Sequence, residues 1–521
     1  MSLTMVWAWQ SGHILGSLGP SCSHSWRHFR QRHLAMLITP ATYTAPLRYI
    51  GLSDRPGHGQ PLSKPRPSPG QVGRVRDRFD AIVVGAGLAG CMAARTLAEK
   101  GFSTCLIEAK PAEKVGEKVC ADAVGKHHFD RLGLAYPKGE ELREEVKGIR
   151  IFSPSREISF FVPGDGFILN RKAFGQRLLK EALDAGAELL DETRALAPIV
   201  KDGFVVGVVA KDLREGRRME FYGDVSVDAS GFLAVLRRNM PAGSGLQAEV
   251  DGHDYCVGYR EVREVREEPE PGVCRIYLSG TLAPGGYAWV FPAGEGKVNV
   301  GLGVQAVEGH PNPKSLLYGT FLKWPAFEGS RLIEAGGWFI PTRRPLENMV
   351  WNGLILAGDA ACQANPLHGG GIGHALLGGS LAGEVASDAL EEGDASLEAL
   401  WPYNRRYMEL VGARNAELDV FRCFLQNLDD DDIEFGMRKK LVSEEDLAAV
   451  SEGRSLEVGV REKLARALRG LTRPGFLKRL ARTLDLMKAV RAHYGAYPSS
   501  PSGFGAWEKK AKKLFSEARE L

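Results

Sequence analysis

The sequence predicts an α/β fold in which a Rossmann-like domain carries an inserted antiparallel sheet and a helical C-terminal region. Three observations support this prediction. Residues 79–108 have the pattern strand, glycine-rich turn, helix, strand and acid. Residues 241–345 contain Tyr, Val and Trp runs with Gly and Pro turns and little helical periodicity, which favours an antiparallel sheet. Residues 391–521 place apolar residues at heptad-like spacing, which favours helices.

These patterns also set the expected domain boundaries. Residues 78–240 and 346–390 form the first, discontinuous domain, because a second strand-and-turn pattern follows the sheet region. Residues 241–345 form the inserted sheet domain, where we expect the substrate to bind. Residues 391–521 form the helical region, whose basic amphipathic segments are either solvated faces or surfaces for an anionic membrane.

The N-terminal residues 1–77 differ in composition from the rest of the chain. They hold only two acids, Asp54 and Asp77, and are rich in Arg, His, Ser, Pro and Gly. We expect this extension to be disordered, or absent from the native protein through a mis-started reading frame, because the sequence from Val75 onward looks like a natural start. No apolar stretch typical of a secretory signal occurs, and an organellar presequence remains the alternative.

Composition and charge exclude several classes of function. The 521 residues are 44% hydrophobic and 25% charged, which is typical of a globular chain of two or three domains. A net charge of +3 is too small to indicate nucleic-acid binding. No apolar run approaches the roughly 18–20 residues that span a bilayer.

The cysteines favour a cytoplasmic protein with free thiols. The 8 cysteines show no C-x-x-C pair and no metal-ligand spacing, so we expect no bound metal. A pair such as Cys256 and Cys274 could still form a disulfide.

A dinucleotide-binding turn is predicted at the start of the first domain. Gly85, Gly87 and Gly90 form G-x-G-x-x-G between an apolar run and a helical pattern. The first glycine permits the turn, the second lets the backbone approach a pyrophosphate, and the third lets the helix pack on the sheet. The helix N-terminus offers free N–H groups to phosphates. Glu108, which ends the second strand, can accept hydrogen bonds from a ribose.

Two single residues stand out between this turn and the sheet domain. Cys120 lies between a loop and a short helix; a free cysteine is most often simply a small buried side chain. Arg171 lies at the start of an amphipathic helix, where it either contacts a cofactor phosphate or is solvated. Asp228 and Gly231 then form a turn after another strand, over residues 225–227.

Two later segments complete the candidate site. Strand-like alternation places Tyr287, Trp289 and Phe291 on one face, before Pro292. Such a stripe is either core or the lining of a long apolar pocket. Residues 354–373 repeat the strand-and-turn pattern and end in dense glycines at a helix start, which indicates a ligand against the backbone.

Together these motifs resemble a known cofactor-binding fold. The turn with Glu108, the Asp228 turn and Gly358-Asp359 with the following helix resemble the FAD-binding fold of the para-hydroxybenzoate hydroxylase and glutathione reductase group. The segment 117–122 and the aromatic stripe resemble the geranylgeranyl reductase family, and most closely its archaeal branch. The resemblance covers about residues 79–425, and Ala121 departs from the glycine expected there.

The resemblance implies FAD as cofactor and assigns a role to each motif. Cys120 would lie in the active site beside the flavin, and the aromatic stripe with Pro292 would contact the prenyl chain. The implied FAD contacts are Gly85, Gly87, Leu88, Ala89, Gly90, Glu108, Lys118, Cys120, Ala121, Arg171, Asp228, Gly231, Gly358, Asp359, Gly370, Gly371 and Ile372.

The implied reaction is saturation of the isolated double bonds of geranylgeranyl chains in archaeal-type ether lipid precursors. No carbonyl polarises such a bond, so proton and hydride addition would pass through tertiary carbocation character. Aromatic faces at 287, 289 and 291 would stabilise that charge, and Cys120 is one candidate proton donor. The electron donor would be NAD(P)H or a ferredoxin, and the apolar substrate suggests peripheral membrane contact.

Two rival functions share this fold. A flavin monooxygenase or halogenase would consume oxygen, and the tryptophan-rich halogenase signature does not occur in this sequence. A prenyl-binding escort, similar to Rab GDP-dissociation inhibitors, would not need the flavin motifs, which are intact here.

Overall fold

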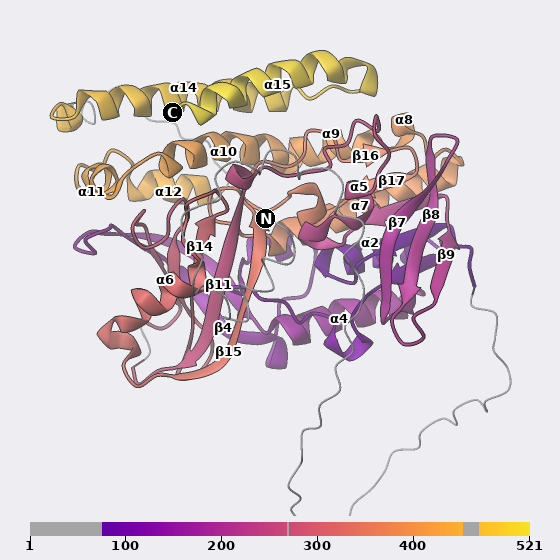
Figure 1. The fold of residues 1–521 in the computed structure, drawn as a ribbon, viewed down its shortest axis with the longest axis horizontal. Coiled ribbons are helices and arrows are strands. Elements are labelled where there is room, and N and C mark those ends of the chain that lie inside the picture. Colours follow the sequence, from indigo (N-terminus) through magenta and orange to yellow (C-terminus); the bar gives the residue numbers. More distant parts are fainter. Residues whose placement is uncertain (1–75, 268–269, 452–467) are drawn as a thin grey trace, which may run out of the picture. The chain divides into compact units, whose positions relative to one another are not determined.

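The computed structural model describes residues 76–267, 270–451 and 468–521. The extension predicted for residues 1–77 therefore falls almost entirely outside the described residues. Three sheets of six, eight and three strands organise the described chain, with helices covering them (Figure 1).

The six-stranded sheet forms the predicted Rossmann-like domain. Its order is β16 (Val350–Trp351), β17 (Leu354–Leu356), β10 (Val225–Asp228), β1 (Ala81–Val84), β2 (Thr104–Ile107) and β6 (Glu188–Leu190). All neighbours pair in parallel except β16 and β17. β1 and β2 are buried throughout, because helices cover the faces of a parallel sheet.

Helix packing on this sheet depends on small residues. α2 (Leu88–Glu99) connects β1 to β2 and packs against α7 (Ile372–Glu392) and α4 (Arg171–Asp184). A Cβ at Gly379 would lie 2.1 Å from the Ala89 carbonyl oxygen, so only glycine permits this helix contact. The contact fixes the start of α7 beside the dinucleotide turn.

The eight-stranded sheet draws strands from two parts of the chain. Its order is β15 (Arg331–Pro341), β11 (Tyr255–Glu264), β14 (Lys297–Gln305), β13 (Ala288–Pro292), β12 (Val273–Tyr277), β4 (Leu142–Phe152), β5 (Ser159–Leu169) and β3 (Ala123–Gly125). Three of these strands, β3, β4 and β5, lie outside residues 241–345, the range predicted for the sheet domain. Moreover, β4 and β12 pair in parallel, so the sheet is mixed. Because the paired strands are far apart in the chain, no pattern within either strand predicts that they are neighbours.

The remaining elements frame these two sheets. The three-stranded sheet consists of β7 (Thr193–Lys201), β8 (Phe204–Asp212) and β9 (Arg218–Tyr222). The shorter helices are α3 (His127–Leu132), α5 (Val235–Arg238), α6 (Pro313–Gly319), α8 (Leu397–Leu400), α9 (Pro402–Tyr407), α11 (Asp430–Arg438) and α12 (Glu444–Ser451).

Three longer helices lie in the C-terminal region. α10 (Ala413–Gln426) follows a π-helical turn over Met408–Gly412, and it packs against α14 (Pro474–Gly495) and α15 (Phe504–Arg519) (Figure 1). Among the described residues no helix is long and apolar enough to cross a bilayer. Cys256 and Cys274, which could have formed a disulfide, are both free thiols.

Candidate active site

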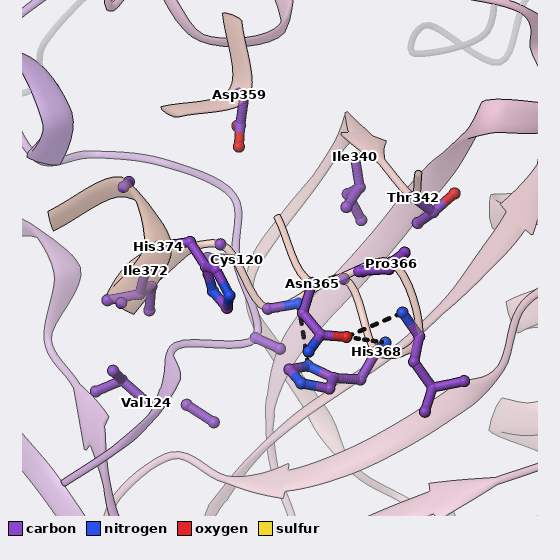
Figure 2. Close-up of a pocket in the computed structure, with 18 of the residues that line it drawn as sticks. Cys120, Val124, Ile340, Thr342, Asp359, Asn365, Pro366, His368, Ile372 and His374 are labelled. Carbon is purple, nitrogen blue, oxygen red and sulfur yellow. Dashed lines mark hydrogen bonds between the residues drawn. The ribbon is translucent and has the colours of Figure 1, made fainter. Parts of the chain in front are cut away.

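A cavity of 1970 Å³ lies where the dinucleotide turn, the eight-stranded sheet and α10 meet. Figure 2 shows Cys120, Asp359, Ile372 and His374 around it. Most of the residues predicted to bind cofactor line this cavity: Gly85, Gly87, Leu88, Ala89, Glu108, Lys118, Cys120, Ala121, Arg171, Gly231, Gly358, Asp359, Gly370, Gly371 and Ile372. Segments far apart in sequence thus contribute to one site.

The dinucleotide turn distinguishes its three glycines by the space around them. A Cβ at Gly85 would lie 2.6 Å from the Ala229 carbonyl oxygen, and one at Gly90 only 1.8 Å from the Gly85 carbonyl oxygen. A Cβ at Gly87 would meet nothing within 4 Å. Gly85 and Gly90 therefore permit close packing, whereas Gly87 faces open space in which a ligand fits.

Glu108 and the helix starts complete the polar lining of this part of the cavity. The Glu108 carboxylate accepts the Ala86 N–H at 2.8 Å and the Lys110 N–H at 2.9 Å. Neither α2 nor α7 has a side-chain cap or an acid in its first turn. Their N-terminal N–H groups are therefore available to an acidic ligand.

Lys118 and Asp359 form an ion pair across the cavity. The Lys118 Nζ lies 2.8 Å from Asp359 Oδ2, and this pair links the loop before Cys120 to the turn after β17. Arg171 is buried, and its Nε has no hydrogen-bond partner among the described residues. A buried guanidinium N–H without a partner indicates a polar ligand in the cavity.

Three predicted contacts do not line the cavity. Asp228 is fully buried, and its carboxylate accepts N–H groups of Ser230, Leu236 and Arg237, which fixes the turn into α5. Local backbone donors occupy both carboxylate oxygens, so the contact between Asp228 and a cofactor stays a prediction that the cavity lining does not support. Gly90 contributes only close packing. Pro292 is buried at the end of β13, outside the lining.

The Cys120 thiol lies between a cation and a backbone donor. The Arg171 Nη1 lies 3.8 Å from Cys120 Sγ, and the Asp122 N–H donates to the same sulfur at 3.3 Å. Burial raises the pKa of the Cys120 thiol, the Asp122 charge raises it further, and Arg171 opposes both. The sulfur is therefore a protonated thiol at neutral pH.

The loop that carries Cys120 is tied to the sheet face. The Cys120 carbonyl oxygen accepts from Asn299 Nδ2 at 2.8 Å and from Arg260 Nε at 3.2 Å. The Asn299 Oδ1 in turn accepts the Trp289 indole N–H at 3.0 Å. The backbone at Cys120 and the aromatic stripe are thus held in a fixed relation.

The aromatic stripe, for which the alternation left core and pocket lining as alternatives, faces the cavity. Tyr287, Trp289 and Phe291 all line it, with ring centroids 6.0 and 6.4 Å apart in succession. The Tyr287 hydroxyl donates to the His368 carbonyl oxygen at 2.6 Å, which joins the stripe to the loop before α7. Apolar side chains from β4 and β12, including Ile149 and Ile276, extend this lining.

Asp122 is a candidate that sequence reasoning did not assign. It lines the cavity in the left-handed backbone region, at φ 68°, which non-glycine residues rarely adopt. Its Oδ1 is buried without a partner among the described residues, and Arg143 lies 3.7 Å from its other oxygen. Burial raises the pKa of this carboxyl to about 6, while Arg171 and Arg260 lower it. In the sequence, only its position two residues after Cys120 could have indicated Asp122 as a site residue.

The loop before α7 is ordered by Asn365. Its Oδ1 accepts the N–H groups of Leu367 at 2.9 Å and His368 at 3.4 Å (Figure 2). The His368 Nδ1 then accepts the Gly370 N–H at 3.2 Å. His368 therefore has a positioning role in the loop. Among the described residues no group of His, Cys, Asp and Glu is arranged to bind a metal.

Comparison with known proteins agrees with this geometry. Residues 254–339 match the family model described as the geranylgeranyl reductase catalytic domain, and residues 80–146 match that of glucose inhibited division protein A. The chain is 41% identical over 442 residues to digeranylgeranylglycerophospholipid reductase of Sulfolobus acidocaldarius, covering 84% of this chain and 98% of that one. Identity to the protein of that name from Methanothrix thermoacetophila is 35% over 361 residues, covering 68% and 89%.

Solved structures extend the likeness to the fold. A geranylgeranyl bacteriochlorophyll reductase-like protein from Thermoplasma acidophilum matches with a TM-score of 0.66 at 26% identity, covering 78% of this chain and 100% of that one. The flavin-dependent brominase Bmp2 matches with a TM-score of 0.56 at 18% identity, covering 77% and 100%. The second likeness shows the fold alone.

Proposed function

This chain belongs to the geranylgeranyl reductase family, and we infer that it is an FAD-dependent reductase that saturates isolated double bonds of geranylgeranyl chains in archaeal-type ether lipid precursors. One observation supports this function above the others. The Cys120 loop, the start of α7 and the aromatic stripe line a single cavity. A polar end suited to a dinucleotide thereby adjoins an apolar face suited to a prenyl chain.

The residues present fit FAD. A pyrophosphate-containing cofactor would fill the open space at Gly87 and bind the uncapped starts of α2 and α7. It would also accept from Arg171 Nε, which has no partner within the described part of the chain. Glu108 would accept hydrogen bonds from a ribose. Bound and reduced, the flavin supplies a hydride to the alkene.

The chain's own residues would orient the alkene and exclude water. Tyr287, Trp289 and Phe291 present aromatic rings to a cavity whose neighbouring lining is apolar. Each ring face would stabilise developing positive charge on a tertiary carbon by about 1–2 kcal/mol when desolvated. The apolar lining keeps water from that carbon, which would otherwise be trapped as an alcohol.

Cys120 would hold the proton that the alkene requires. Its thiol is protonated at neutral pH and faces the cavity. Asp122, whose N–H bonds the sulfur, has a carboxyl suited to return a proton to it. Saturation of one double bond then consumes one hydride and one proton, and it leaves the thiol to be reprotonated through Asp122.

Mass spectrometry of the reaction product tests this function. Dithionite-reduced protein incubated with a geranylgeranyl lipid should yield products heavier by about two mass units per saturated bond. Incorporation of oxygen instead would identify a monooxygenase, and a colourless protein without flavin would identify an escort. Either result would overturn the proposal.

Substitution of Cys120 tests its role separately. Cys120→Ala should retain flavin but reduce turnover by about 10²-fold or more, the usual contribution of a positioned acid. Cys120→Ser should retain more activity than the alanine variant, because a hydroxyl still carries a proton. Wild-type turnover in Cys120→Ala would remove the thiol from the mechanism.

Two partners follow from the same proposal. The electron donor is NAD(P)H or a ferredoxin. Anaerobic mixing of each donor with the oxidised protein distinguishes them, because the true donor bleaches the flavin spectrum.

The membrane supplies the substrate, and the edge strand β15 exposes Leu332, Ile333 and Trp338 near Phe339, which lines the cavity. Sedimentation with lipid vesicles, compared with a Leu332→Ser/Ile333→Ser variant, tests that contact.

A further inference from the structure

One buried amide, that of Asn299, hydrogen-bonds to two groups of the proposed reaction site. Its Oδ1 accepts the Trp289 indole N–H at 3.0 Å, and its Nδ2 donates to the Cys120 carbonyl oxygen at 2.8 Å. Asn299 is 1% exposed and lies outside the cavity lining, whereas Trp289 and Cys120 both line the cavity. Asn299 therefore lies behind these two residues and is placed to act through them.

The register of the sheet places Asn299 within reach of the indole. On β13 and β14, Trp289 lies opposite Gly301 and Phe291 lies opposite Asn299. Asn299 is thus the diagonal neighbour of Trp289 on the same face of the sheet, a separation that aromatic side chains span. Gly301 leaves room for the ring, because a Cβ there would lie 2.5 Å from Trp289 Cζ2. The glycine and the hydrogen bond together fix the orientation of the indole.

The segment that carries Cys120 depends on tethers of this kind. Residues 117–122 have no regular secondary structure, so the hydrogen bonds of a helix or sheet do not fix them. Arg260 of β11 donates to the Cys120 carbonyl oxygen at 3.2 Å, and the Asp122 carbonyl oxygen accepts the Leu169 N–H at 3.0 Å. Asn299 makes the shorter of the two bonds at the Cys120 carbonyl, and it alone of these tethers also bonds to the aromatic stripe.

The proposed reaction requires the thiol and the indole in a fixed mutual position. The thiol gives its proton to one carbon of the double bond, and positive charge develops on the adjacent tertiary carbon. The face of an aromatic ring stabilises that charge only when the ring lies over the adjacent carbon. A displacement of about 1 Å in a reacting group can lower a rate by about 10²-fold, so the relative position of sulfur and ring affects turnover strongly.

We propose that Asn299 is a positioning residue that sets the Cys120 thiol and the Trp289 ring relative to each other, at the two carbons of the alkene. This inference rests on the proposed function and adds to it a residue outside the cavity lining. The amide group is planar and bonded at both ends. Loss of the indole bond at one end therefore weakens the hold on the Cys120 carbonyl at the other.

Alkylation of Cys120 tests this linkage without measuring turnover. The holoprotein is treated with N-ethylmaleimide, and peptide mass spectrometry follows the modification of Cys120 alone. Asn299→Leu has nearly the shape of asparagine but forms no hydrogen bonds, so Cys120 should react about fivefold faster as its segment opens more often. Trp289→Phe keeps an aromatic ring but removes the N–H, and it should accelerate the reaction by a smaller factor.

The double variant distinguishes a linkage from two separate effects. If Trp289 acts on Cys120 through Asn299, adding Trp289→Phe to Asn299→Leu should cause no further increase in the alkylation rate. Rate increases that multiply, or a wild-type rate in Asn299→Leu, would overturn the proposal. If Asn299→Leu does not fold, Trp289→Phe alone decides, and a wild-type rate in that variant is the contrary result.

Two substitutions outside the cavity lining serve as matched controls. Asn239→Leu changes an exposed asparagine, and Trp351→Phe changes a half-buried tryptophan. Both should leave the alkylation rate of Cys120 at the wild-type value, because neither residue bonds to the Cys120 segment or to the stripe.

Kinetics show whether the linkage serves the reaction. Asn299→Leu should lower kcat for a geranylgeranyl lipid about tenfold and change KM by less than about twofold, because the residues that bind the lipid remain. In a Cys120→Ala background, the same substitution should lower kcat by less than about twofold, because no thiol remains to be positioned. A further tenfold loss in that background would indicate a merely structural role and would contradict the proposal.

The two readouts distinguish this inference from the proposed function. A wild-type protein that does not reduce geranylgeranyl lipids contradicts the proposed function, whereas the alkylation rates still decide whether Asn299 holds Cys120. An active reductase whose Asn299→Leu variant is alkylated at the wild-type rate overturns this inference alone.

Discussion

Asp122, two residues after Cys120, combines backbone strain, burial and a carboxyl oxygen that has no partner among the described residues. A non-glycine residue at φ 68° costs of the order of 1–3 kcal/mol and persists mainly where function requires it. Asparagine tolerates the same left-handed conformation. Asp122→Asn therefore removes the titrating proton while preserving the backbone.

We expect Asp122→Asn to change how activity depends on pH. The pKa of the carboxyl is raised from 3.8 to about 6, chiefly by burial, so its proton is lost as pH rises through about 6. If Asp122 reprotonates Cys120, wild-type kcat should fall above that pH, and the asparagine variant should show a lower, flat profile. Arg143, Arg171, Arg260 and Glu334 face this carboxyl and are unchanged by the substitution.

Stability supplies a control for the same substitution. Below about pH 4 the carboxyl is protonated in both the folded and the unfolded state, so its raised pKa does not lower the free energy of unfolding. Above about 6 the folded protein holds a buried charge, which lowers its stability. Asp122→Asn should therefore raise Tm at pH 8 more than at pH 4. An unaltered pH profile of kcat with this Tm change would show a structural role only.

At the scale of elements, the turn between β1 and α2 contains two glycines with different expected roles. Gly90 is needed for folding, whereas Gly87 is expected to matter only for cofactor binding. Gly87→Ala should fold normally, because its Cβ meets nothing within 4 Å and its φ of −73° suits alanine. Gly90→Ala should unfold or lose much stability, because its Cβ would lie 1.8 Å from the Gly85 carbonyl oxygen.

Flavin content and apoprotein melting distinguish these two variants. Gly87→Ala should keep the wild-type apoprotein Tm but retain less flavin, because the added methyl group occupies the space of the ligand. Gly90→Ala should lower the apoprotein Tm by several degrees. Full flavin content in Gly87→Ala would show that the pyrophosphate binds elsewhere.

The elements that sequence predicts well are those whose signals are local. The turn with Gly85 and Gly87 and the alternating stripe at 287, 289 and 291 lie in the cavity because a motif or a period of two encodes their direction. Asp228 shows the limit, since the resemblance cannot reveal that three backbone N–H groups already occupy its carboxylate.

Features that depend on contacts distant in sequence could not be predicted. The pairing of β4 with β12, which sets Gly148 opposite Val273, joins segments far apart in the sequence. That Asp122 Oδ1 has no partner among the described residues is likewise visible only in the folded chain.

At the scale of the whole molecule, a buried ionic network joins the eight-stranded sheet to the C-terminal helices. Glu347, which follows β15, accepts from Arg343 at 2.9 Å, Arg344 at 2.8 Å and the Tyr494 hydroxyl of α14 at 3.2 Å. Arg344 also pairs with Asp419 of α10 at 3.1 Å. Because α10 lines the cavity, this network positions the cavity-lining face of α10 as well as stabilising the fold.

The network predicts loss of stability in acid. The charges of Arg344 and Arg343 lower the pKa of Glu347 from 4.5 to about 2 despite burial, which raises it. A depressed carboxyl pKa contributes stability above about pH 4.5, and this contribution is lost as pH falls through about 2. The difference corresponds to roughly 3 kcal/mol at pH 7. Glu347→Gln should lower the free energy of unfolding by about that amount at pH 7.

Urea unfolding at several pH values measures this contribution. The difference in free energy of unfolding between wild type and Glu347→Gln should be largest at pH 7. It should decrease steadily between pH 4.5 and 2, because the wild-type carboxylate becomes protonated there. Glu398→Gln, at an exposed carboxylate of α8, should show no comparable gap. A gap that stays constant with pH would mean that Glu347 stabilises by packing and not by charge, and α10 would then be held by its apolar contacts with α14 and α15.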